Sequence, residues 1–313
     1  MVASKLNGST EPRPERNPGP SWGFRAMRFW RRVLPEFVFV ILLHIGVWIA
    51  VGTMKSAREH SRVYLRTVLA TEPGRAEIHR HFYTFVRYLL ERLRLWDNRA
   101  PRAFRLTGAD RHGPRFLRLV LSGKPFIAGA FHVGYSELLG FLLSPKHGRM
   151  SMLRMRVGNT EDTDCMAANY RDVLEILWIN DPGERIFALK HAMDQGRGVL
   201  LLCDRAEFSA KQEAFHFLGA NRWFPFTQYH LALLYDVPVV LTYALPDENK
   251  KAELRVRASP VFHPPKELSK EEQLAMARTH FQEFLTRLEA DLRRRPYYWF
   301  NFEPLNPVAS GRT

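Results

Sequence analysis

Residues 126–137 read Phe126-Ile-Ala-Gly-Ala-Phe-His132-Val-Gly134-Tyr-Ser-Glu137. The first six residues are apolar throughout, which is typical of a strand buried on both faces of a parallel sheet. Gly134 then permits a sharp turn, and the residues that follow suit a helix. A strand that turns into a helix predicts an α/β fold. It also places His132 and Glu137 at the carboxyl edge of a sheet, where ligands of such folds bind.

His132 and Glu137 meet only if the chain turns between them. Along a continuous helix, a spacing of five residues rotates the second side chain by about 140°, and the two would diverge. With a turn at Gly134, Glu137 can accept a hydrogen bond from one imidazole nitrogen and make the other more basic. A histidine and a carboxylate paired in this way are the least that a site needs to remove a proton from an alcohol. The alternative is coincidence, because the spacing alone is common.

The segments on either side alternate between strand-like and helix-like patterns. Strands are predicted at 152–157, 199–203, 237–245 and 254–261. Helices are predicted at 63–95 with a break at Pro73-Gly74, at 136–143, 161–176, 183–195 and 225–235, and from Ser269, which forms a capping-box pattern with Glu272. This alternation predicts a mostly parallel central sheet flanked by helices.

The N-terminal region has a different composition. Residues 1–22 are rich in proline, glycine and charge, and we expect them to be disordered. Residues 23–56 combine arginines at near-helical spacing with an apolar run from Phe37 to Val51. As a helix this run is about 22 Å long, short of a hydrocarbon core of roughly 30 Å. We therefore expect a membrane-associating helix embedded in one leaflet, with a short span and a buried core helix as alternatives.

The chain has a formal net charge of +14, which favours polyanions such as nucleic acid, anionic lipid headgroups or an acidic protein. It contains no zinc, RNA-recognition or helix-turn-helix signature, so nucleic acid is the weakest of the three. No Cys and His residues have metal-ligand spacing, and Cys203 lies in a predicted buried strand. We expect no metal and a reducing compartment.

Two known motifs match the sequence only in part. Gly129 to Ser136 has the glycine spacing of a P-loop without its lysine. Gly134 to Leu138 resembles a nucleophile elbow, but a leucine replaces the second glycine that the sharp turn needs. Ser136 is therefore not expected to act as a nucleophile.

Asp204 and Arg205 close another predicted strand and should lie at the same sheet edge as His132. Arg205 is a candidate clamp for a phosphate or a developing negative charge, with an Asp204–Arg205 ion pair as the structural alternative. The aromatic segment 217–226 is interpreted as a loop. It either lines an apolar channel with Arg222 near its mouth or simply fills the core.

These features occur in a recognisable order: a strand, His132-x4-Glu137, Asp204-Arg205, the segment Phe217–Pro225 and the tail Tyr298-Trp-Phe-Asn-Phe302. In this order the chain resembles the bacterial lipid A late acyltransferase branch of the lysophospholipid acyltransferase superfamily, from about residue 36 to 305. The resemblance implies that His132 and Glu137 form the catalytic pair of an HX4E motif. It also implies that Asp204 and Arg205 contact the substrate.

We therefore expect an acyltransferase domain over residues 57–305, followed by a tail at 306–313. A fatty acyl chain would pass from a thioester of acyl carrier protein or coenzyme A to a hydroxyl of a lipid or glycolipid, without any cofactor. The expected location is the inner (cytoplasmic) membrane, peripheral or monotopic, with anionic lipid as a partner and the catalytic domain facing the cytosol. The alternatives are a non-catalytic membrane-binding protein on the same fold and a basic nucleic-acid-binding protein.

Overall fold

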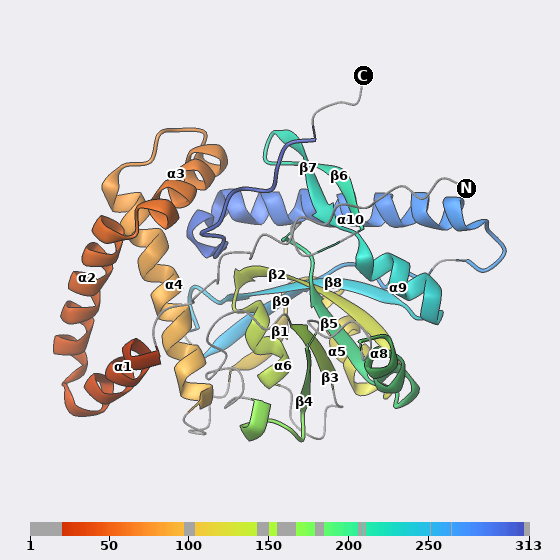
Figure 1. The fold of residues 1–313 in the computed structure, drawn as a ribbon, viewed down its shortest axis with the longest axis horizontal. Coiled ribbons are helices and arrows are strands. Elements are labelled where there is room, and N and C mark those ends of the chain that lie inside the picture. Colours follow the sequence, from red (N-terminus) through yellow and green to blue (C-terminus); the bar gives the residue numbers. More distant parts are fainter. Residues whose placement is uncertain are drawn as a thin grey trace, which may run out of the picture.

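The computed structural model describes residues 21–96, 104–142, 150–154, 167–178, 185–205, 209, 211–250, 252–263 and 265–309. Its centre is a seven-stranded sheet in the order β1-β9-β8-β2-β5-β3-β4 (Figure 1). The strands are β1 (Arg105–Gly108), β2 (Phe126–Gly134), β3 (Met150–Arg154), β4 (Leu174–Trp178), β5 (Gly198–Leu202), β8 (Val239–Pro246) and β9 (Glu253–Ala258). Only the β8–β9 pair is antiparallel among the pairs of this sheet in the described residues. The predicted α/β fold with a mostly parallel sheet is confirmed.

Helices cover both faces of this sheet. The helices among the described residues are α1 (Ser21–Val33), α2 (Glu36–Thr53), α3 (Lys55–Leu69), α4 (Arg75–Trp96), α5 (Gly113–Leu121), α6 (Leu139–Leu142), α8 (Arg185–Asp194), α9 (Thr227–Tyr235) and α10 (Lys270–Arg294). Ile127 and Phe131 of β2 belong to the core cluster that includes α8, α9 and α10, whereas Phe126 and Ala128 belong to the cluster that includes α5 and α6. The alternation along β2 therefore fills two cores, one on each face.

The first four helices form a layer beside the sheet, in which α4 lies between α2 and the strands (Figure 1). Two ring stacks hold α2 lengthwise on α4: His44 on Tyr83 at 4.1 Å, and Trp48 on His79 at 4.4 Å. The predicted break at Pro73-Gly74 is confirmed between α3 and α4. Among the described residues, α2 is the one helix long and apolar enough to cross a membrane, and little of it is buried.

The chain after α10 returns to the sheet. The predicted capping box is present, because the Ser269 side chain accepts from the main chain of Glu272 and the Glu272 carboxylate accepts from the main chain of Ser269. A 3-10 turn, η4 (Pro296–Tyr298), follows the helix. The next residue, Trp299, forms an antiparallel bridge with Val133, directly beside His132.

The predicted loop at 217–226 is instead a β-hairpin. β6 (Gln212–Phe217) pairs with β7 (Ala220–Pro225), and the two turn residues, Leu218 and Gly219, both have positive φ, as a two-residue hairpin turn requires. Pro225 therefore ends a strand, and α9 begins after it. Three phenylalanines of the hairpin and the phenylalanine that follows it are buried in the core: Phe215, Phe217, Phe224 and Phe226.

Two other predicted helices differ from the structure. Of the helix predicted at 161–176, residues 161–166 lie outside the described residues, and from Leu174 the chain forms β4, which pairs with β3 at the sheet edge. The apolar residues taken for a helical face there belong to a strand. The helix predicted at 136–143 is a short 3-10 turn, η1 (Ser136–Leu138), followed by α6. Of the segment predicted to be disordered, residues 1–20 lie outside the described residues.

Candidate active site

A bulge at the end of β2 positions His132. Ala130 pairs with Thr242 and Gly134 with Ala244, so β2 uses four residues where β8 uses two. Gly134 has φ +57°, and a side chain there would collide with the carbonyl oxygen of Ala244. The bulge therefore depends on glycine, and it redirects the His132 side chain at the carboxyl edge of the sheet.

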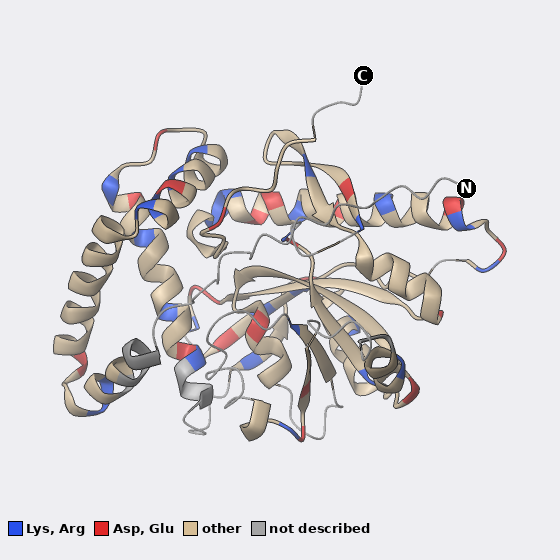
Figure 2. Ribbon diagram, viewed as in Figure 1, with Lys and Arg blue, Asp and Glu red and all other residues tan. Residues whose placement is uncertain are grey.

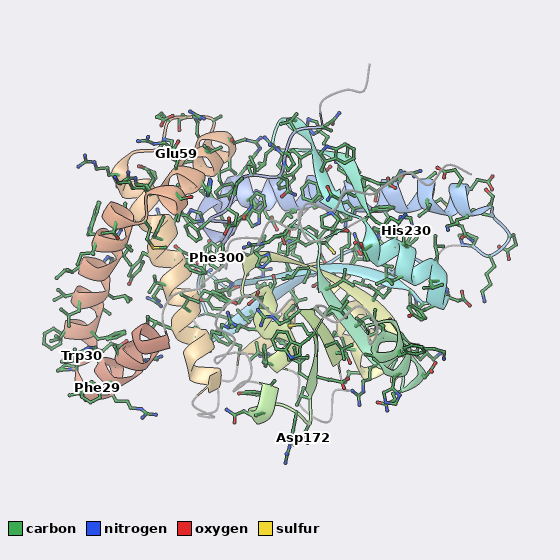
Figure 3. All side chains as sticks on the ribbon, viewed as in Figure 1. Phe29, Trp30, Glu59, Asp172, His230 and Phe300 are labelled. Atoms are coloured by element: carbon green, nitrogen blue, oxygen red, sulfur yellow. The ribbon has the colours of Figure 1, made fainter. Side chains whose placement is uncertain are left out.

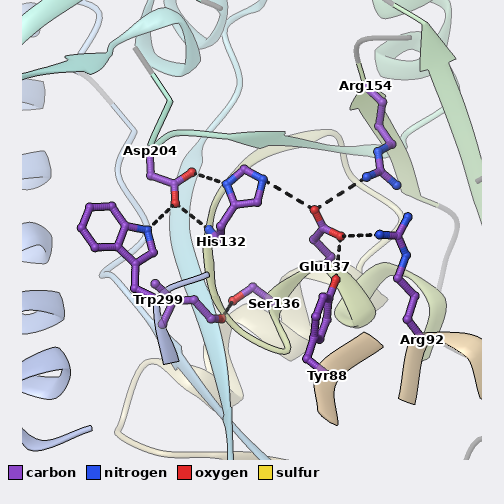
Figure 4. A network of polar contacts seen from close by, with 9 residues as sticks. Tyr88, Arg92, His132, Ser136, Glu137, Arg154, Asp204 and Trp299 are labelled. Atoms are coloured by element: carbon purple, nitrogen blue, oxygen red, sulfur yellow. Dashed lines mark hydrogen bonds and ion pairs between the residues drawn. The ribbon is translucent and has the colours of Figure 1, made fainter. Parts of the chain in front are cut away.

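Asp204 holds His132 at two points. It follows the end of β5, and its Oδ2 accepts the main-chain N–H of His132 at 2.6 Å. Its Oδ1 lies 2.8 Å from His132 Nδ1 (Figure 4). The Asp204 side chain is only 2% exposed, whereas that of His132 is 16% exposed. The carboxylate is thus sealed behind the imidazole, and the imidazole remains accessible.

The charge of Asp204 decides which nitrogen of His132 carries the proton. Burial raises the pKa of Asp204, but the charge and hydrogen bonds of His132 outweigh burial, and the net result is a lowered pKa. Trp299 adds a second neutral donor, because its Nε1–H lies 3.0 Å from Oδ2. An ionised Asp204 can only accept, so Nδ1 of His132 must be the donor. In the neutral ring Nε2 then carries a lone pair, as a general base requires.

Glu137 faces the other nitrogen of His132. Its Oε1 lies 3.7 Å from His132 Nε2, which is an ion-pair distance and too long for a hydrogen bond. On its far side Glu137 accepts a hydrogen bond from the Tyr88 hydroxyl at 2.7 Å. Arg92 and Arg154 lie 3.7 and 3.6 Å from its oxygens (Figure 4). Glu137 is therefore close to the imidazole without being the group that orients it.

Glu137 stays ionised in this position. Burial by itself would raise its pKa, but the charges of Arg154 and Arg92, together with His132 and the Tyr88 hydrogen bond, lower it well below its ordinary value. The pKa of Tyr88 is raised, chiefly by burial and further by Glu137, so Tyr88 keeps the proton that it donates. A fixed negative charge consequently lies on the Nε2 side of the imidazole.

Ser136 is excluded as a nucleophile by its contacts. Its hydroxyl donates to the carbonyl of Val133 at 2.5 Å and accepts the main-chain N–H of Ala244 at 3.0 Å. The residue is 1% exposed. The first bond ties the turn back to β2 and the second ties it to β8, so the serine stabilises the bulge that carries His132.

Arg205 and Arg222 are placed differently. Arg205 follows Asp204, and its Nε is buried without a hydrogen-bond partner in the part of the chain that the structure describes. Arg222 donates instead to the carbonyls of Phe217 and Asn306, at 3.2 and 3.0 Å. The first bond lies within the hairpin, and the second joins the hairpin to the C-terminal tail. The contacts of Arg222 are therefore structural, whereas those found for Arg205 leave one buried nitrogen without a partner among the described residues.

Several residues of the site escaped sequence reasoning. Tyr88 and Arg92 lie four residues apart on α4, continuing the apolar stripe of that helix toward Glu137. Two polar residues on an otherwise apolar helical face were the available signal. Asp204 was placed at the correct edge but assigned to substrate. Its two bonds to His132 have no local signature, since 72 residues separate the pair.

Among the described residues, no group of three His, Cys, Asp or Glu side chains is arranged to hold a metal ion. Neither a comparison with protein-family models nor a search among curated proteins finds a match to this chain.

Proposed function

We propose that this protein is a membrane-associated O-acyltransferase, in which His132 removes a proton from the hydroxyl of a lipid or glycolipid acceptor. The observation that carries the proposal is the hydrogen bond between His132 Nδ1 and the buried carboxylate of Asp204. It leaves Nε2 as a base, at the carboxyl edge of a parallel sheet, beside a fixed carboxylate. The Ser136 hydroxyl is committed to the main chain, and the Tyr88 hydroxyl donates to Glu137, so the base acts on a substrate hydroxyl.

The reaction needs two proton transfers, one to Nε2 of His132 and one from it. The acceptor hydroxyl donates its proton to His132 Nε2 as its oxygen attacks the thioester carbonyl carbon. The tetrahedral intermediate then expels the thiolate of coenzyme A or acyl carrier protein, and the thiolate takes the proton back from Nε2. Asp204 and Glu137 lie on opposite sides of the ring and both stabilise the transient imidazolium. Arg205, or a main-chain N–H near it, is suited to the intermediate's oxyanion.

The apolar surface of α1 and α2 supports a membrane-bound acceptor. Phe29 and Trp30 point outward from α1 and are 58% and 49% exposed (Figure 3). Exposed apolar residues continue along α2: Phe37, Ile41, Leu42, Ile45, Trp48 and Ile49. A contiguous apolar stripe of this kind is typical of a lipid interface. We infer that it inserts into the cytoplasmic leaflet of the inner membrane.

The arrangement of charge favours a helix that lies in one leaflet over one that spans. Basic residues flank both ends of α2, with Arg31 and Arg32 before it and Lys55 and Arg58 after it (Figure 2). α2 is also packed lengthwise on α4, whose opposite side contributes Arg92 to the site. A spanning α2 would draw α4 and its arginines into hydrocarbon, at a high energetic cost. A monotopic anchor keeps those charges in water and the base on the cytosolic side, where acyl thioesters occur.

An assay of acyl transfer tests the proposal. The purified full chain is incubated with acyl-coenzyme A or acyl carrier protein bearing a labelled acyl chain, together with a lipid extract. We expect release of free thiol coupled to the labelling of one lipid class, and loss of both with His132→Ala. Labelling that is equal for the two proteins would refute the assigned base.

A further inference from the structure

We propose that Trp299, His81 and Ser61 are positioning residues that lock the proton of His132 onto Nδ1. The inference rests on the proposed function, because it concerns the same general base. It starts from a line of hydrogen bonds that runs from α3 through α4 and the C-terminal tail to Asp204. Each of these bonds is buried or partly buried, and each has a single allowed direction.

The direction is set first at His81. This histidine is fully buried, and its Nε2 lies 2.8 Å from the main-chain carbonyl of Trp299. Since a carbonyl can only accept, Nε2 of His81 must carry the proton. Nδ1 of the neutral ring is then an acceptor, and the Ser61 hydroxyl, 2.8 Å away, donates to it. Burial lowers the pKa of His81 to about 4, so the ring is neutral at pH 7.

Trp299 takes part in two of these hydrogen bonds, one through its main-chain carbonyl and one through its indole N–H. Its ring is 1% exposed and is held edge-on by Tyr64 at 5.1 Å and by Phe217 at 5.5 Å. Its main chain is held by the bridge to Val133. The indole Nε1–H therefore has a fixed position when it donates to Oδ2 of Asp204 at 3.0 Å.

This donor completes the hydrogen bonds of Asp204. Oδ2 receives two, from the indole of Trp299 and from the main chain of His132, and Oδ1 receives the imidazole Nδ1–H (Figure 4). With both oxygens engaged on fixed donors, the carboxylate cannot rotate. Removing the indole N–H leaves a buried lone pair without a donor and frees the carboxylate to turn away from Nδ1. The imidazole would then populate both tautomers.

Nitrogen NMR of the full chain measures this directly. With ¹⁵N-labelled histidine, and His132→Ala to assign the signals, the wild type should show one His132 tautomer, with Nδ1 protonated and Nε2 unprotonated. Trp299→Phe, which keeps an aromatic ring but lacks the N–H, should show a mixture of the two. Trp223→Phe, at a tryptophan of β7 that takes no part in these hydrogen bonds, is the matched control and should retain the single tautomer.

Acyl transfer provides the second readout. Loss of a hydrogen bond to a buried charge should lower kcat by about 10- to 100-fold, with KM for both substrates nearly unchanged. His81→Gln should retain most of the activity, because its amide N–H replaces the Nε2 donor. His81→Phe, which lacks any donor, should resemble Trp299→Phe.

The outcomes separate the two proposals. If Trp299→Phe retained both the single tautomer and the wild-type kcat, the positioning role would be overturned while the acyltransferase would stand. If His132→Ala remained active, the proposed function would fall, yet the tautomer measurement would still decide whether Trp299 fixes the ring. Should Trp299→Phe not fold, an analogue in which sulfur replaces the indole N–H, β-(3-benzothienyl)alanine at 299, keeps the two-ring shape and serves the same test.

Discussion

Asp204, 72 residues further along the chain, holds His132 by its main chain and by its ring, at 2.6 and 2.8 Å. Glu137, only five positions away in the sequence, approaches the same ring no closer than 3.7 Å. The imidazole thus lies between two carboxylates with different tasks. Asp204 fixes the ring, and Glu137 provides charge on the Nε2 side, where the proposed acceptor would bind.

Replacing Asp204 by asparagine should nearly abolish acyl transfer. The main-chain N–H of His132 and the indole of Trp299 would both donate to the single amide oxygen of the asparagine. The amide NH₂ would then face Nδ1 of His132. The ring would then carry its proton on Nε2 and could not act as a base. We expect kcat to fall by about 10²- to 10⁴-fold in the thioester assay. Asp194→Asn, at an exposed residue of α8, is the control, and an equal loss there would indicate a nonspecific effect.

Gly134→Ala should destabilise the protein by about 3 kcal/mol or more, because it combines strain at positive φ with a collision against the carbonyl of Ala244. Gly123→Ala is the matched control. Gly123 also has positive φ, but a side chain there meets nothing within 4 Å, so only about 1–2 kcal/mol should be lost. Denaturant unfolding of both variants measures the difference. Equal losses would mean that the contact with β8 does not constrain the bulge.

His81 should make folding stability depend on pH between about 6.5 and 4. Burial lowers its pKa in the folded state to about 4 from 6.5. As the pH falls through this range, the unfolded chain binds a proton that the folded chain does not, so stability is present above pH 6.5 and is lost toward pH 4. A shift of this size corresponds to about 3 kcal/mol. Urea unfolding of His81→Gln across the same range should show a correspondingly flatter profile, and an unchanged slope would contradict the assignment.

Charges placed on the exposed face of α2 should weaken membrane binding. Ile41 and Ile45 are 55% and 50% exposed, so Ile41→Asp with Ile45→Asp should leave the fold intact. Removing both isoleucine side chains from the membrane should cost about 3 kcal/mol or more in binding free energy. Vesicle sedimentation with anionic lipid should detect this as a loss of about 100-fold or more in binding. Leu234→Asp, on α9 and 68% exposed, is the control. If it weakened binding equally, α2 would not be the docking surface.

Local patterns predicted the elements that local interactions determine. The apolar run before His132, the break at Pro73-Gly74 and the capping box at Ser269 each specify one element through neighbouring residues. The hairpin at Gln212–Pro225 is not evident from local patterns, because Phe215 and Phe224 pack against Phe281 of α10, a partner that lies later in the chain. The apolar residues near Leu174 fit the spacing of a helix as well as that of a strand. Pairing with β3 makes this segment a strand.

The site was predictable only in part for the same reason. His132, Glu137 and Asp204 were placed at one sheet edge, because parallel strands bring their carboxyl ends together. Which carboxylate binds the ring depends on the bulge in β2, whose size follows from the register with β8. Tyr88 and Trp299 reach the site from α4 and the tail, and no spacing in the sequence indicates those contacts.

Comparative mass spectrometry of total lipids tests the central claim most directly. Cells that carry the intact chain, His132→Ala, Glu137→Ala or no copy are compared, with the chain's presence in the membrane fraction confirmed by immunoblot. We predict that one acylated lipid species appears only with the intact chain and is missing from both variants, although both remain membrane-bound. If both variants still produced that species, the assignment of His132 as the general base would be contradicted.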